Sequence, residues 1–222
     1  MFQPIELEVF QQRTSISDSE LVFPWDKAKL IVAFRDIGEI QSIQVMPEAY
    51  LEKLIRNTTL AGPAQEKVYA NCKIKRARID PHNVLVGQTF VERPKYEKLL
   101  ENLTDSFKGF CVNRGFAKCS ALIILGETKD GNPAVAHYIP PIVEEHHGGS
   151  YLLDGVHRNF LTRAIGTTIE SIILKNVKVP FPCDVQSWRH VAIVEQKPPK
   201  NERYHNLKPE LFRDLKWVGI DG

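Results

Sequence analysis

Hydrophobic residues occur in short alternating or continuous runs along most of the chain, a pattern that predicts strands separated by turns. In the first part of the chain, residues 29–46 indicate two short strands around residues 36–38, and Pro47 then begins a helical pattern. Small residues with glycine and proline gather over 58–67, where we expect a boundary. The sequence therefore predicts a β-rich N-terminal extension over residues 1–65.

The middle of the chain alternates between extended and helical patterns. Residues 72–83 predict a strand and a loop, and residues 93–107 carry apolar positions at helical spacing. Three further strands follow: one that ends near Gly126, one that runs through Val143, and one over 150–153.

The last third of the chain predicts two helices and two strands. The first helix covers residues 156–165 and ends before Gly166, because glycine commonly follows the last helical residue. Continuous apolar runs at 169–174 and 190–196 predict strands, and residues 207–219 predict a terminal helix.

Composition and charge set limits on the functional class. Of the 222 residues, 43% are hydrophobic and the net charge is only +2, so the overall field does not favour nucleic acid or an anionic membrane. The four cysteines form no C-x-x-C pair, no leader pattern is apparent, and no apolar run approaches about 20 residues. We therefore expect a cytoplasmic protein with reduced thiols and no membrane partner.

Candidate chemistry gathers where the strand over 150–153 meets the next helix. Asp154 could cap this helix, and Gly155 would let the backbone approach a ligand. His157 and Arg158 fall in the first helical turn, where two cations are unfavourable beside the helix dipole unless an anion binds there. The junction therefore predicts an anion site.

A purely structural explanation of this junction stays open. Asp-Gly is a common turn, Arg158 could pair with Glu144 or Glu145, and His157 could be a half-buried imidazole.

Two segments carry a resemblance to a known family. The stretch YLLDGVHRNFLTRAIGTTIESIIL, together with IDPHNVLVGQTFVERPKYEKLLENL upstream, resembles the ParB/sulfiredoxin-like superfamily over Lys73 to Val177. In that superfamily a strand, a G-x-H-R turn and a helix form a nucleotide phosphate site, and the closest members are the free serine kinases. The resemblance implies an α+β domain over 66–222, with a small mixed sheet and flanking helices, in addition to the extension over 1–65.

This chain departs from the family pattern at several places, and these departures reduce the number of family activities that we expect of it. Val156 stands where sulfiredoxins have their reactive cysteine, so sulfinic acid repair is not expected. The chain after Val177 offers no helix-turn-helix region like that of the ParB partition proteins. Asn83 stands where the serine kinases have a glutamate base, and an amide cannot accept a hydroxyl proton.

The resemblance implies a phosphotransferase that binds ATP or another nucleotide with Mg²⁺ and phosphorylates a small hydroxylated acceptor. Asp154, His157 and Glu92 are its candidate catalytic residues, with Glu92 as a substitute base unless it is only a solvated glutamate at a helix start. Asp154 and Asn83 are the candidate metal ligands. The candidate nucleotide-binding residues are Gly155, Val156, His157, Arg158, His82, Asn83, Gln88 and Thr89.

Other functions remain open from the sequence. The basic run over 73–78 is compatible with a nucleotide-gated DNA-binding or nuclease module, although alternation on a strand splits it between two faces and favours edge protection. The cluster at 144–147 is interpreted as exposed beside a hairpin turn. A catalytically inactive binding module is the third alternative, because of Asn83.

Overall fold

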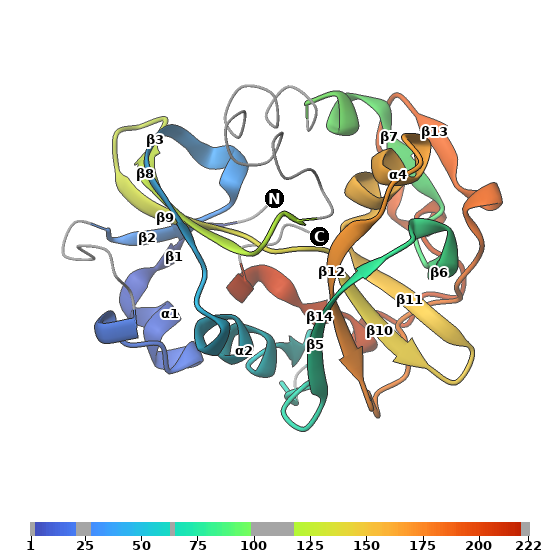
Figure 1. The fold of residues 1–222 in the computed structure, drawn as a ribbon, viewed down its shortest axis with the longest axis horizontal. Helices are drawn as coiled ribbons and strands as arrows, with labels where there is room; N and C mark the ends of the chain where they lie inside the picture. Colours follow the sequence, from blue (N-terminus) through green and yellow to red (C-terminus); the bar gives the residue numbers. More distant parts are fainter. Residues whose placement is uncertain (1–2, 21–27, 63–64, 99–117, 219–222) are drawn as a thin grey trace. The chain divides into compact units, whose positions relative to one another are not determined.

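The computed structural model describes residues 3–20, 28–62, 65–98 and 118–218, and it is a mixed α+β protein with several small sheets (Figure 1). The chain divides into two compact units. Unit 1 comprises Met1–Asn71, Ser120–Ile139 and Arg213–Gly222, and unit 2 comprises Cys72–Cys119 and Pro140–Phe212.

Unit 1 is built on a five-stranded sheet with the order β1-β2-β9-β8-β3. Its strands are β1 (Ile5–Glu6), β2 (Leu30–Val32), β3 (Ile37–Val45), β8 (Leu122–Thr128) and β9 (Pro133–Tyr138). Its helices are α1 (Leu7–Thr14) and α2 (Glu48–Arg56), and β4 (Thr59–Leu60) pairs with β14 (Arg213–Asp214). Short 3₁₀ turns occupy Asp18–Glu20, Phe34–Asp36 and Leu215–Val218.

Unit 2 contains a second five-stranded sheet with the order β5-β12-β10-β11-β6. Its strands are β5 (Lys73–Ile79), β6 (Val84–Val86), β10 (Ile142–His146), β11 (Gly149–Asp154) and β12 (Ile169–Lys175). The helix α4 (Val156–Ala164) connects β11 to β12, and β7 (Phe90–Glu92) pairs in parallel with β13 (Ala192–Val194). The 3₁₀ turns are η4 (Pro81–Asn83), Trp188–His190, Lys200–Glu202 and Pro209–Leu211.

The core that positions α4 lies on one face of the unit 2 sheet. Side chains alternate between the faces of a strand, so Val143 and Leu152, which oppose each other in β10 and β11, point to the same side. They pack with Val156 of α4 and with Trp188 in one apolar cluster. The first turn of α4 is therefore anchored to the sheet by Val156, and α4 lies against η4 and β7 (Figure 1).

The division into units differs from the predicted boundary after residue 65. The strand expected to run through Val143 is two strands, because Pro140 and Pro141 interrupt the pattern and proline donates no backbone hydrogen bond. The first of them, β9, pairs with β8 and β2 in unit 1, while β10 belongs to unit 2. The N-terminal part is therefore a unit with its own sheet, completed by residues 120–139, and not an extension of residues 1–65 alone.

Several other local predictions are confirmed, and the predicted terminal helix is wrong. The strands at 29–46, the helix after Pro47 and the strand–helix–strand series of β11, α4 and β12 are present. The predicted helix over 207–219 is not formed in the described residues, which fold into 3₁₀ turns around the short β14 instead. Pro209 lacks the backbone N–H that a continuous helix needs. The helix predicted over 93–107 begins at residue 93, and its part from residue 99 lies outside the described residues.

Candidate functional site

Gly155 fixes the turn between β11 and α4. Its φ of +90° lies in the left-handed region that side chains disfavour, and a Cβ at this position would lie 2.8 Å from Cβ and Cγ of Pro141. The space that we expected to admit a ligand is therefore filled by Pro141. Glycine is required here for backbone conformation and for close packing.

Asp154 and Arg158 form an ion pair across the first turn of α4. Arg158 Nη2 donates to Asp154 Oδ2 at 2.7 Å, and the two side chains are 14% and 18% exposed. No side chain in the described residues caps α4, so the predicted capping by Asp154 is wrong, because its carboxylate turns to the guanidinium instead. The first helical hydrogen bond runs from Asn159 N to Gly155 O, which leaves the earlier N–H groups of α4 outside the helical pattern.

His157 is a neutral ring at physiological pH. Burial lowers its pKa to about 4, assisted by the positive charges of Lys95, Arg158 and Lys197, while Glu92 acts in the opposite direction. The backbone N–H of Glu92 donates to His157 Nε2 at 3.0 Å. Since Nε2 accepts, the neutral ring carries its proton on Nδ1. His157 can therefore donate one hydrogen bond to an anion, and it supplies no positive charge near pH 7.

Glu92 is held beside this histidine. It ends β7, its side chain is 13% exposed, and Oε1 lies 3.0 Å from Lys95 Nζ. Glu92 does lie at a helix start, directly before residue 93, as the alternative had it, but its side chain is largely buried and not solvated. A half-buried carboxylate next to His157 is in the place that a general base for this site would need.

Lys95 and Lys197 are members of the site that the sequence analysis missed. Both side chains are exposed, and both act on the pKa of His157, Lys95 from 62 residues before it and Lys197 from 40 residues after it in the sequence. With Arg158 they place three cations around the start of α4, against the two carboxylates of Asp154 and Glu92. Lys95 lies three residues after Glu92, which is a sequence signal for its place in the site. No motif in the sequence around Lys197 indicates that it belongs to the site.

The loop around residues 80–83 lies next to α4. Asp80 accepts a hydrogen bond from the backbone N–H of His82 at 2.9 Å, which closes a tight turn. The buried indole Nε1 of Trp188 donates to Pro81 O at 2.7 Å. The His82 backbone is thus fixed by structural contacts, while Asn83 lines a separate cavity on the sheet.

Gln88 and Thr89 use their side chains within the fold. Gln88 Nε2 donates to Phe90 O at 2.6 Å, and Thr89 Oγ1 donates to Glu202 O at 2.7 Å. Gln88 also forms a β-bridge with Tyr204, whose pKa is raised to about 12 by burial and by nearby groups that include Asp154. These two residues therefore hold the segment around residue 204 in place, and Tyr204 is a further neighbour of the junction that the sequence did not indicate.

The acidic and histidine cluster over 144–147 is partly buried, so its predicted exposure is wrong. Glu144 is fully buried, and its Oε2 lies 2.7 Å from His146 Nε2. The ring of His146 stacks on Tyr151, with 4.9 Å between ring centroids. Strand alternation places Glu144 and His146 on the sheet face opposite Val143, away from the core that holds α4.

The predicted metal ligands do not come together as a protein-built cage. Within the described part of the chain no group of three or more histidine, cysteine, aspartate or glutamate side chains could hold a metal ion. Asp154 is already paired with Arg158, and Asn83 lines the other cavity. The residues fit an anion at the start of α4 better than a protein-held Mg²⁺.

The basic run over 73–78 divides as predicted. β5 is an edge strand, and Arg76 Nε donates to Glu170 Oε1 at 2.9 Å on one face of the sheet. Lys75 points to the other face. The three cysteines in the described residues, Cys72, Cys119 and Cys183, are buried thiols that form no disulfide with one another.

Comparisons with known proteins identify no relative. No protein-family model, no curated protein and no solved structure matches the chain. Among the helices in the described residues, none is long and apolar enough to cross a membrane.

Proposed function

We propose that unit 2 is a nucleotide-binding phosphotransferase of the ParB/sulfiredoxin-like fold, which binds nucleotide phosphates at the start of α4. The observation that carries this proposal is the uncapped first turn of α4, surrounded by Arg158, Lys95 and Lys197. Backbone N–H groups outside the helical pattern, the positive end of a helix and three cations favour a polyanion. The spatial approach of the 80–83 loop to α4 supports the proposed fold.

Each residue of the junction has a role in this proposal. Arg158 binds phosphate oxygens while Asp154 fixes the guanidinium at 2.7 Å, and His157 donates from Nδ1. Lys95 and Lys197 add charge at the rim. Phosphoryl transfer depends mainly on such positioning and charge stabilisation.

The proton of the acceptor goes to Glu92 in this mechanism. As the acceptor hydroxyl oxygen forms its bond to the terminal phosphorus, its proton passes to the Glu92 carboxylate, and the bond from phosphorus to the leaving nucleotide oxygen breaks. Asn83 cannot take this proton. Mg²⁺ would arrive with the nucleotide, and no step here depends on a metal held by the protein.

The experiment that tests the binding proposal is calorimetric titration of the full chain with ATP, ADP, CTP and GTP in the presence of Mg²⁺. Binding by none of the four nucleotides would overturn it. Arg158→Gln and Asp154→Asn form a matched pair, because each removes the same ion pair and they change the charge in opposite directions.

If Arg158 holds phosphate, Arg158→Gln weakens nucleotide binding about 10- to 100-fold, since a charge-assisted hydrogen bond contributes about 1.5–3 kcal/mol. Asp154→Asn keeps binding or strengthens it, although it would impair transfer if Asp154 orients the acceptor. Equal losses of stability with unchanged nucleotide affinity in both variants would show that the pair is only structural.

A further inference from the structure

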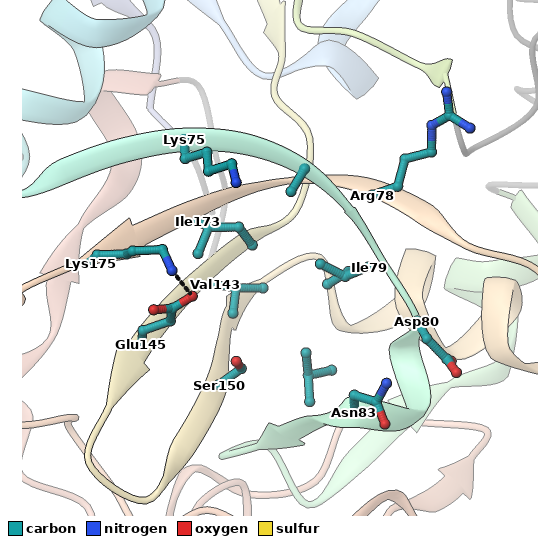
Figure 2. Close-up of a pocket in the computed structure, with 12 residues that line it drawn as sticks. Lys75, Arg78, Ile79, Asp80, Asn83, Val143, Glu145, Ser150, Ile173 and Lys175 are labelled. Atoms are coloured by element: carbon teal, nitrogen blue, oxygen red, sulfur yellow. Dashed lines mark ion pairs between the residues drawn. The ribbon is translucent and has the colours of Figure 1, made fainter.

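A cavity of about 300 Å³ opens on the unit 2 sheet, apart from the start of α4 (Figure 2). Its lining comes from β5, η4, β6, β10, β11 and β12, all within this unit. Val84, Val143 and Ile173 form a buried apolar floor. The cavity therefore has the volume of a small-molecule site and an apolar base on which a ligand could pack.

The polar groups of the cavity are arranged around this floor. Lys175 Nζ lies 2.8 Å from Glu145 Oε1, so these two charges compensate each other. Lys75 has no ion pair within the part of the chain that the structure describes, and Figure 2 shows its ammonium group turned into the cavity. The Ser150 hydroxyl points inward from the opposite side, whereas the Arg78 side chain extends away.

The remaining carboxylate at the rim is already engaged. Asp80 Oδ1 accepts the hydrogen bond from His82 N, and Asn83 beside it offers an uncharged amide. Since Lys175 is paired with Glu145 and Arg78 extends away, Lys75 is the cation that is left to select a ligand. A cation above an apolar floor favours an anion whose body is hydrophobic.

We propose that this cavity binds a small organic acid, with its carboxylate at Lys75 and its apolar body on Val84, Val143 and Ile173. The Ser150 hydroxyl, on the opposite side, would lie near the far end of the ligand. Asn83 would bond to a polar substituent at the far end. A single aliphatic or aromatic ring is the size that about 300 Å³ accommodates.

This site is separate from the one proposed for nucleotide phosphates. Ser150 and Asp154 lie on one face of β11, four residues and so about 13 Å apart. Leu152 lies between them and is buried with Val156 in the apolar cluster. A small acid in the cavity therefore does not reach the start of α4, and this inference stands or falls independently of nucleotide binding.

Benzoate is the probe, compared with acetate and with benzylamine on the full chain by calorimetry and by NMR chemical-shift titration. We expect saturable benzoate binding at least about tenfold tighter than acetate, because the ring buries apolar area on the floor. Benzylamine has the same body with the opposite charge and should bind about tenfold or more weakly than benzoate.

Lys75→Gln and Lys73→Gln are the matched variants, since both residues lie on β5, point to the same face and are exposed, and only Lys75 lines the cavity. Lys75→Gln should weaken benzoate binding about tenfold, and Lys73→Gln should leave it within about twofold.

Three results would overturn the inference. They are no saturable benzoate binding, equal binding of benzoate and benzylamine, and equal losses in the two lysine variants. Repeating the benzoate titration with saturating ATP separates the two sites. Unchanged benzoate affinity supports separate sites, and competition between the two ligands would overturn the separate placement.

Discussion

Two histidines of this chain are held neutral, one in each compact unit, and their surroundings differ. His137 of β9 is 3% exposed, shares a 2.7 Å hydrogen bond with the hydroxyl of Tyr50, and has a pKa lowered to about 3 by burial alone. His157 has a pKa lowered to about 4 by burial together with three neighbouring cations. A similar shift therefore has two meanings: His137 belongs to a closed core, and His157 borders a charged surface that suits an anion.

The comparison also shows why a lowered pKa alone does not mark a site. The ring of Phe10 lies 5.6 Å from the ring of His137, and no charged group contributes to its shift. Around His157 the charges come from the 93–98 helix, from α4 and from the segment after β13. The convergence of separate segments on one half-buried ring is the feature that indicates function.

The largest expected effect concerns the turn that presents His157. Gly155→Ala should lower the free energy of unfolding by about 2–5 kcal/mol, because alanine disfavours the φ of +90° and its Cβ would overlap Pro141. Gly166→Ala at the other end of α4 is the control: φ is +68° and nothing lies within 4 Å of the added Cβ, so only about 1–2 kcal/mol is lost. Urea unfolding measures both, and equal losses would contradict the importance of the Pro141 contact.

The next effect tests the closed site in unit 1. Tyr50→Phe removes the hydroxyl that bonds to His137 Nε2 and leaves a buried nitrogen without its partner, which should cost about 1–3 kcal/mol of unfolding free energy. Tyr96→Phe is the control, because its hydroxyl makes only an exposed contact of 3.4 Å with Arg93 and should change stability by about 0.5 kcal/mol or less. A negligible effect of Tyr50→Phe would show that the Tyr50–His137 bond contributes little to the core.

The parts of the fold that could be predicted are those that short sequence features determine. The Asp-Gly pair before α4 and Gly166 after it mark both helix ends, and alternation reveals β10 and β11. The placement of β8 and β9 in unit 1 depends on pairing with β3 and β2, strands that lie some 80 to 100 residues earlier in the sequence, and a hydrophobic pattern does not encode partners. The Pro140-Pro141 pair was the one local sign of the break.

In the candidate site too, one contact could be predicted from local sequence and the others could not. The pairing of Asp154 with Arg158 follows from their spacing of four residues across the helix start, so sequence alone could have predicted it. The bond from Glu92 N to His157 Nε2 joins residues 65 apart, and the approach of Lys197 depends on the path of the chain after β13. Such contacts arise from tertiary folding, which periodicity does not describe.

A smaller effect is expected from the exposed cations near His157. Lys197→Ala should weaken nucleotide binding about two- to fivefold, because one exposed charge contributes only about 0.2–1 kcal/mol. Lys200→Ala, three residues further along the chain and also exposed, removes the same charge without a place beside His157 and should have no effect. Calorimetric titration with the tightest-binding nucleotide measures the difference. Equal effects of the two variants would show that Lys197 contributes only through the overall charge and not through its place beside His157.

The smallest effect separates the two histidines directly. An anion beside His157 stabilises the protonated ring, so a bound nucleotide should raise the pKa of His157 from about 4 by about half a unit to one unit. By reciprocity, nucleotide affinity should rise as the pH falls from about 6 toward 4. The pKa of His137, sealed beside Tyr50, should stay at about 3.

Histidine ring signals followed by NMR from pH 7 to pH 4, with and without nucleotide, measure this pKa change. Both histidines have folded-state pKa values below the ordinary value of about 6.5, so the unfolded chain binds protons first and stability decreases as the pH falls from about 6.5 toward 4. Each sample therefore needs a check that the chain is folded at that pH. If nucleotide leaves the His157 titration unchanged, the phosphates do not lie at the start of α4. The lowered pKa of His157 would then, like that of His137, reflect its surroundings in the fold and would not indicate a binding site.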